Sequence, residues 1–246
     1  ASAPGDLYER SPGELSARGA DARGGLSCLL REEAARTLHG RRLPSNEVLM
    51  LLRSFALAFL LVTGLAADVR AEQTIVFFRH GEKPSGGFGQ LTCQGLNRAL
   101  ALPDVLLAKF GRPAYLYAPN PTVQMNDSGV LYYYVRPLAT IEPTAIRLRM
   151  PVNTKYGYNE ISRLRASLIR SIWANATLFV AWEHEELVKV VQSIMNSYGG
   201  RAKVSQWTSG DYHALYVLRV VFVSSGPHPR FERDREGLNG LPTSCP

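Results

Sequence analysis

Two histidines stand where a short apolar run of the chain gives way to polar residues. Arg79 and His80 follow the run 74–78. His184 follows the run 177–182 in the same way. A guanidinium group is permanently charged and its planar fork matches the oxygens of a phosphate group. An imidazole that is neutral near pH 7 is a nucleophile competent to attack phosphorus. The arrangement therefore indicates phosphoryl transfer through a phosphohistidine.

The two apolar runs determine where these side chains should lie. Both runs are short, rich in β-branched and aromatic residues and without polar alternation, which is typical of strands buried on both faces of a parallel sheet. Ligands bind beyond the carboxyl ends of such strands. We therefore expect His80 and His184 to face one anion. For a single histidine the ordinary interpretation is a structural or surface residue, and we keep that interpretation for His213 and His228.

The rest of the chain alternates strands with helices. Further strands are predicted at 114–118, 130–135 and 213–223, the last of these closing the domain. Helices are predicted at 92–110, 137–150, 161–173 and 187–198. Pro103 should bend the first helix, and Pro143 predicts a kink or a late start in the second. This order predicts one α/β domain with a mostly parallel sheet.

The first 71 residues are predicted to lie outside that domain. Residues 1–49 show no convincing apolar period and are read as an upstream extension without a role in the fold. Residues 50–71 have a basic start, an apolar middle and a small-residue end, which is the layout of a secretory signal peptide. The apolar run is shorter than the roughly 20 residues that span a bilayer, so a retained anchor is the second interpretation. The domain itself is assigned to residues 72–246.

Composition narrows the classes of partner and cofactor. Hydrophobic residues make up 46% of the 246 residues, enough for a sizeable core, and the formal net charge is +7. This charge suits an anionic ligand, but no basic run interleaved with aromatic residues indicates nucleic acid. The three cysteines have no zinc-binding spacing, so no structural metal is expected. Cys93 and Cys245 lie beyond the signal, where they form either one disulfide or two free thiols.

Four motifs, in order along the chain, carry a resemblance to a known family. Residues 78–84 (Phe-Arg-His-Gly-Glu-Lys-Pro) are similar to the Arg-His-Gly signature of the histidine phosphatase superfamily, which includes the phosphoglycerate mutases and the histidine acid phosphatases. Residues 91–95 resemble the Leu-Thr-x-x-Gly that opens the family's first helix. Residues 136–143 resemble its Arg-Ala-x-x-Thr-Ala-Glu-Pro segment. His184 matches the second family histidine.

The resemblance implies a specific site and fold. His80 would be the phosphorylated nucleophile, and Arg79, Arg136 and His184 would bind the phosphate group. No metal or organic cofactor would be required. The fold would be a doubly wound, phosphoglycerate mutase-like sheet flanked by helices. The segment 120–135 is longer and more aromatic than in the mutases. It is a lid, a substrate-binding hairpin or an edge hairpin whose tyrosines pack on the sheet.

The general acid is less clearly indicated than the nucleophile. The acid phosphatase branch places an acidic residue directly after the second histidine, which favours Glu185. Glu183 is the second candidate, although it should project to the opposite face if the strand continues that far. Glu82 and Glu160 are further candidates, and each carboxylate could instead pair with an arginine.

The function predicted from these residues is hydrolysis of phosphate monoesters outside the cytoplasm. We expect a periplasmic or secreted, metal-independent phosphatase acting on a small or exported phosphoester, without nucleic acid and without stable membrane insertion after signal cleavage. The alternatives are a mutase-like phosphotransferase and an inactive module that binds phosphorylated ligands. The oligomeric state and the natural substrate are not indicated by the sequence.

Overall fold

The computed structural model describes residues 70–246. The predicted upstream extension, 1–49, and all but the last two residues of the predicted signal peptide, 50–71, lie outside this range. The described residues fall within one compact unit. Ala71, the last residue of the predicted signal, is also the first residue of strand β1, Ala71–Arg79.

A six-stranded sheet forms the centre of the domain, with the strand order β5-β2-β6-β1-β7-β8. Besides β1, its strands are β2 (Tyr115–Tyr117), β5 (Val152–Asn153), β6 (Thr177–Trp182), β7 (Ala214–Val223) and β8 (Gly226–Arg235). The first four strands of that order are mutually parallel, and β7 runs antiparallel to its neighbours β1 and β8. The prediction of an α/β domain with a mostly parallel sheet is confirmed.

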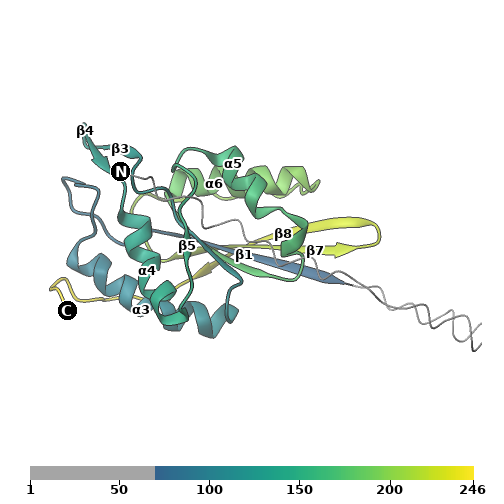
Figure 1. Cartoon of the computed structure of the whole chain (residues 1–246), viewed down its shortest axis with the longest axis horizontal. Helices are drawn as coiled ribbons and strands as arrows, with labels where there is room; N and C mark the ends of the chain where they lie inside the picture. The colour runs from purple at the N-terminus through teal and green to yellow at the C-terminus, as the bar shows by residue number, and fades with distance from the viewer. Residues whose placement is uncertain (1–69) are drawn as a thin grey trace, which may run out of the picture. The chain divides into compact units, whose positions relative to one another are not determined.

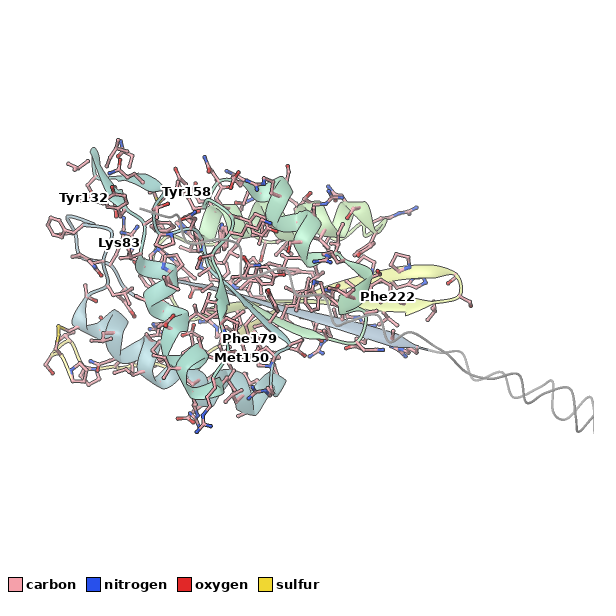
Figure 2. The ribbon with its side chains drawn as sticks, in the orientation of Figure 1. Lys83, Tyr132, Met150, Tyr158, Phe179 and Phe222 are labelled. Carbon is pink, nitrogen blue, oxygen red and sulfur yellow. A yellow bond between two sulfur atoms is a disulfide. The ribbon has the colours of Figure 1, made fainter. Side chains whose placement is uncertain are left out.

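Helices cover both faces of this sheet (Figure 1). Helices α3 (Cys93–Phe110) and α4 (Arg136–Leu148) lie on one face. Phe179 belongs to the hydrophobic core on this face, and Met150 packs against that core (Figure 2). Helices α5 (Ile161–Leu168) and α6 (His184–Ser197) lie on the other. Because β1 and β6 carry apolar side chains toward both helical layers, they need the unbroken apolar runs that the sequence shows.

Several boundaries differ from those predicted. The strand 213–223 is not the last, because residues 226–235 add β8 as an edge strand whose alternation is hidden by prolines and charges. The helix predicted at 161–173 ends at Leu168, and a separate 3₁₀ turn, η1, covers Ser171–Trp173. Helix α6 begins at His184 rather than at residue 187. Helix α4 begins at Arg136 and continues through Pro143, so the late start is not observed.

A separate two-stranded hairpin precedes α4. Its strands are β3 (Gln124–Asp127) and β4 (Val130–Tyr133), paired antiparallel and not hydrogen-bonded into the main sheet. The prediction of a hairpin in this segment is confirmed, but it is not an edge of the central sheet. Figure 1 shows it at the end of the molecule where the carboxyl end of β1 also lies.

The C-terminal residues are attached to α3. Cys245 forms a disulfide with Cys93, the first residue of that helix, so the paired alternative is the observed one. Asn97 also donates hydrogen bonds to the carbonyls of Pro242 (2.9 Å) and Ser244 (2.8 Å). The tail thus lies along the first helical turns, as Figure 1 shows.

Candidate active site

The ends of β1 and β6 bring the predicted site residues together. In the parallel pair, Arg79 is opposite Trp182, so both strands end at the same level of the sheet. His80 follows directly, and its backbone N–H donates to the Trp182 carbonyl at 3.3 Å. His184 begins α6 two residues after β6 ends. The predicted meeting of two histidines at the carboxyl edge therefore has a structural basis in the register of these strands.

His80 is buried and held as a neutral imidazole with a defined tautomer. Its Nδ1 lies 2.7 Å from the carbonyl oxygen of Gly81. A carbonyl only accepts hydrogen bonds, so Nδ1 carries the proton and Nε2 keeps its lone pair. Burial, followed by the positive charges of Arg136 and Arg79, lowers the pKa of His80 well below its ordinary value. The residue therefore has the protonation state that a nucleophile requires.

Arg79 is the first of two buried guanidinium groups beside His80. Its Nη1 donates to the carbonyls of Ser209 and of Asp211, the second at 3.4 Å. Its guanidinium lies over the ring of Tyr212, 4.1 Å from the centroid. The same ring lies 6.2 Å from His80. The segment before β7 thus anchors one side of the arginine while the other side faces the site.

Arg136, the second guanidinium group, begins α4 and is 2% exposed. Its Nη1 pairs with the carboxylate of Asp127 on the hairpin and donates to the Gly87 carbonyl at 3.4 Å. Lys83 pairs with the same carboxylate at 2.6 Å. Burial by itself raises the pKa of Asp127, but the hydrogen bonds and charges of Lys83 and Arg136 lower it overall. Asp127 is therefore a carboxylate that fixes Arg136.

The threonine of the predicted 136–143 motif connects α4 to the loop 80–92 between β1 and α3, which is called the nucleophile loop because it begins with His80. Thr140 is fully buried, and its hydroxyl donates to the Arg136 carbonyl at 2.9 Å. The same oxygen accepts from the backbone N–H of Gly81 at 2.9 Å. One side chain therefore sets the position of the loop after His80 relative to the helix that carries Arg136.

Two glycines let the nucleophile loop lie directly against α3. A Cβ on Gly81 would stand 2.7 Å from the carbonyl oxygen of Gly95, and one on Gly95 would stand 2.5 Å from the carbonyl oxygen of Glu82. Both contacts are with backbone atoms, which cannot move aside. The Gly of the Arg-His-Gly sequence is thus required by backbone packing.

Glu183 is buried at the start of α6, where its carboxylate contacts Nδ1 of the half-buried His184 ring. Glu183 is the N-cap residue, and its carboxylate also accepts from the Glu186 N–H at 2.8 Å. Burial by itself raises the pKa of Glu183, but the ring of His184 and the N–H groups of the helix start lower it overall. The condition under which Glu183 would project to the opposite face is not met, because β6 ends at Trp182, and the carboxylate acts on Arg79.

The other candidate acids lie in different surroundings. Glu185 is exposed in the first turn of α6. Glu82 makes two contacts with Arg98, at 2.6 and 3.0 Å, and Glu160 is paired with Arg163. Glu82 and Glu160 therefore each pair with an arginine, which was the stated alternative to a role as the general acid.

The two histidines that were interpreted as ordinary surface or core residues, His213 and His228, have other contacts. His228 is exposed on β8 and contacts the hydroxyl of Ser225 at 3.0 Å. His213 precedes β7 and lies 3.4 Å from a nitrogen of Arg98.

Three buried hydrogen-bond donors around His80 have no well-aligned partner among residues 70–246. They are Arg79 Nε, Arg136 Nε and the hydroxyl of Tyr134. Tyr134 is 1% exposed, and its ring meets the His80 ring edge-on at 6.0 Å. Buried donors are almost always satisfied in native proteins. Three unsatisfied donors beside one buried imidazole indicate that a ligand with several acceptor oxygens belongs there.

Sequence reasoning missed four residues of this site: Lys83, Asp127, Tyr134 and Tyr212. Each acts through a contact with a residue distant in sequence or in an irregular segment, so no local pattern indicates it. A basic residue after the Arg-His-Gly-Glu sequence was visible, but its partner on the hairpin was not. Figure 2 shows Lys83, Tyr132 and Tyr158 together at the hairpin end of the molecule.

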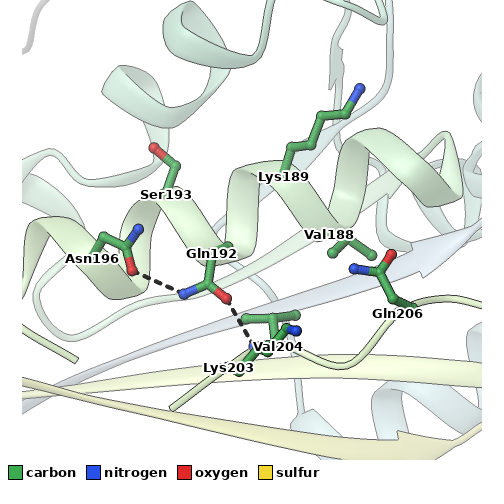
Figure 3. A pocket seen from close by; sticks show the side chains of 8 residues that line it. All are labelled: Val188, Lys189, Gln192, Ser193, Asn196, Lys203, Val204 and Gln206. Carbon is green, nitrogen blue, oxygen red and sulfur yellow. Dashed lines mark hydrogen bonds between the residues drawn. The ribbon is translucent and has the colours of Figure 1, made fainter. Parts of the chain in front are cut away.

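A hollow elsewhere on the surface is unrelated to this chemistry. It lies between residues 188–196 of α6 and residues 203–206 (Figure 3). Gln192 crosses it, with hydrogen bonds of 2.9 Å to Asn196 and to the backbone N–H of Val204. Neither histidine of the site lines it.

Within residues 70–246, no group of three or more His, Cys, Asp or Glu side chains is placed to hold a metal ion.

Among the helices that the structure describes, none is both long enough and apolar enough to cross a lipid bilayer.

Comparisons with known proteins give matches among solved structures only. No protein-family model matches the chain, and no curated protein matches it. A protein assigned as the phosphohistidine phosphatase SixA from Nakamurella multipartitia is 13% identical, with 65% of this chain and 95% of that chain covered and a TM-score of 0.42. The mycobacterial glucosyl-3-phosphoglycerate phosphatase Rv2419c is 12% identical over 65% and 97% of the two chains, with a TM-score of 0.46. A phosphoglycerate mutase from Bacillus anthracis str. Sterne is 10% identical over 65% and 92%, with a TM-score of 0.39. These three structures are members of the histidine phosphatase superfamily, which the motifs around His80, Arg136 and His184 resemble.

Proposed function

We propose that residues 72–246 hydrolyse phosphate monoesters through a phosphohistidine formed on His80. One observation carries the proposal: a neutral, buried imidazole with a free Nε2 is surrounded by buried donors that lack acceptors. A phosphoryl group presents several anionic oxygens at once and would satisfy these donors. Its phosphorus atom would also be the electrophile that Nε2 of His80 attacks.

The reaction follows from the protonation states. The Nε2 lone pair of His80 forms a bond to phosphorus, and the bond from phosphorus to the ester oxygen breaks. Arg79, Arg136 and His184 balance the charge on the remaining phosphoryl oxygens, a form of electrostatic stabilisation that is often the largest single contribution to catalysis. Water then attacks phosphorus, the P–N bond breaks, and inorganic phosphate leaves with neutral His80 restored. No metal takes part in this scheme.

Glu185 is proposed as the acid that protonates the leaving alcohol, and Glu183 as the residue that positions His184. Glu183 contacts the His184 ring, and its lowered pKa keeps it a carboxylate, which cannot supply a proton. Glu185 stands one residue after His184 and is exposed, so it can exchange protons with water.

The compartment proposed for this reaction is the periplasm or the extracellular space. The disulfide between Cys93 and Cys245 supports it, because such bonds persist in oxidising compartments. The layout of residues 50–71 as a secretory signal points the same way. The substrate would be a small or exported phosphoester whose dianionic group enters the site.

Trapping the covalent intermediate tests the proposal. Residues 72–246 are mixed with a panel of ³²P-labelled monoesters and quenched within milliseconds, and the label on protein is followed. We expect label that is lost in acid and stable in base, as a phosphohistidine is. It should be absent in His80→Asn and retained in His228→Asn, which changes an exposed histidine on β8.

Other outcomes would favour other functions. Phosphate binding without label or turnover on any monoester would indicate a binding module. Transfer of the label to a second alcohol in preference to water would indicate a phosphotransferase. Loss of activity on treatment with a chelator would contradict the metal-free scheme.

Substrates with different leaving groups distinguish the roles proposed for Glu185 and Glu183. Glu185→Gln should slow hydrolysis of alkyl phosphates, which need protonation, by about 100-fold, and should leave activated aryl phosphates much less affected. Glu183→Gln should slow both classes similarly, because it disturbs His184. Equal effects of Glu185→Gln on both classes would remove Glu185 from the role of acid.

A further inference from the structure

The hydroxyl of Tyr134 is a buried polar group that the scheme above does not use. Tyr134 lies between β4 and α4, two residues before Arg136. Its ring meets His80 edge-on and Tyr158 at 5.5 Å, and the guanidinium of Arg136 lies 4.9 Å from its centroid. The side chain is thus enclosed by residues of the proposed phosphate site.

The Arg136 guanidinium interacts with this hydroxyl, but a guanidinium only donates hydrogen bonds. The proton of the hydroxyl therefore has no well-aligned acceptor within the part of the chain that the structure describes. A buried donor without an acceptor destabilises the folded state. Phenylalanine would fill the same space without that cost. A tyrosine at this position therefore destabilises the unliganded fold unless its hydroxyl has another use.

The electrostatic surroundings keep the hydroxyl protonated. Burial first, and the negative charge of Glu183 second, raise the pKa of Tyr134, and the nearby Arg136 and Arg79 only partly offset them. The group is consequently a hydrogen-bond donor at every physiological pH. It stands beside the same imidazole as the two unpartnered Nε atoms of Arg79 and Arg136.

We propose that Tyr134 is a catalytic residue whose hydroxyl donates a hydrogen bond to an oxygen of the phosphoryl group during transfer to His80. The proposal rests on the function proposed above. No bond to the tyrosine forms or breaks, and its proton stays on the phenol. A neutral donor adds to the charged ones because it binds an oxygen without further lowering the pKa of His80. The ligand thereby satisfies the donor that the protein leaves without a partner.

Tyr134→Phe tests the proposal, with Tyr216→Phe as the matched control. Tyr216 is equally buried, but its hydroxyl donates to the Ser205 carbonyl at 2.8 Å. We expect Tyr134→Phe to keep or raise the melting temperature and to lower kcat for an aryl phosphate by about 100-fold, the usual effect of removing one transition-state donor. Inhibition by vanadate, which adopts the geometry of the transferring phosphoryl group, should weaken in parallel. Tyr216→Phe should show the reverse pattern, with lower stability and nearly unchanged kcat.

The outcomes separate this inference from the function on which it rests. If wild-type protein is labelled on His80 but Tyr134→Phe retains full kcat and vanadate inhibition, Tyr134 has no catalytic role and the phosphatase proposal stands. A fall in melting temperature with unchanged kcat would show a purely structural hydroxyl and also overturn the inference. If wild-type protein forms no phosphohistidine, both proposals fail together.

Discussion

His80 illustrates how burial prepares a single residue for chemistry. An imidazole in water is half protonated near pH 6.5, and its protonated form has no lone pair for attack on phosphorus. Burial and two neighbouring arginines lower the pKa of His80, while the Gly81 carbonyl fixes the proton on Nδ1. The same surroundings that bind an anion therefore also keep the nucleophile neutral.

A pH dependence follows for activity and for stability. Activity of the wild-type protein should persist below pH 6, with no loss attributable to His80 near 6.5. In the unfolded chain His80 takes up a proton as the pH falls through about 6.5, whereas in the folded protein it does not. Folding stability should therefore decrease as the pH falls below about 6.5, by up to about 1.4 kcal/mol per pH unit from this residue.

Comparing wild type with His80→Gln by urea unfolding between pH 5 and 8 isolates this contribution. The stability of wild type relative to the variant should fall on acidification. A difference that is constant with pH would show that the pKa of His80 is not lowered in the folded protein.

Among the elements, α4 links the two halves of the site. Its first residue is Arg136, and one turn later Thr140 holds the N–H of Gly81. Thr144, a further turn along, is also fully buried, but its hydroxyl makes no hydrogen bond within residues 70–246. The helix therefore carries two buried threonines, one whose hydroxyl is hydrogen-bonded and one whose hydroxyl is not.

These threonines provide a paired test of the contact between α4 and the nucleophile loop. Thr140→Val removes the acceptor of a buried N–H and should cost about 1–3 kcal/mol of stability, with a loss of kcat as His80 shifts. Thr144→Val should be neutral or stabilising and leave kcat unchanged. Denaturant unfolding and steady-state kinetics on both variants measure this, and equal effects would contradict the role given to Thr140.

What the sequence could predict of these elements depended on whether burial leaves a local pattern. Strands β1 and β6 were visible because both faces are covered, which demands continuous apolar runs. The edge strand β8 was not, because its exposed positions carry charges and its apolar positions are few. The two histidines and two arginines directly follow or begin regular elements, so their positions were predictable. Asp127 and Tyr134 gain their contacts only when the hairpin folds onto the site, which no periodicity encodes.

For the whole molecule, the attachment of the C-terminal residues to α3 is the main long-range constraint. The disulfide joins residues separated by 152 positions. In the same helix, Arg98 is buried between two carboxylates. It pairs with Glu82 in the nucleophile loop at 2.6 Å and with Glu236 at 2.5 Å. Burial raises the pKa of Glu236 to about 7 although Arg98 opposes this. The tail, the first helix and the loop after His80 thus form one connected network.

Reduction of the disulfide should weaken the fold measurably. A cross-link closing so long a loop restricts the unfolded chain, and its loss typically costs about 2–5 kcal/mol. Urea unfolding of wild type with and without a reductant should show that decrease. The double variant Cys93→Ser/Cys245→Ser should resemble reduced wild type and be insensitive to reductant, and an unshifted midpoint in reduced wild type would contradict the prediction.

The bond between Cys93 and Cys245 has a consequence for how damage to this protein would be detected. A protease that cuts one peptide bond anywhere between these positions produces two fragments that stay covalently joined. On a non-reducing gel such a nicked molecule migrates near the intact one, and its two pieces separate only after a thiol is added. Purity judged without that step would count nicked molecules as whole.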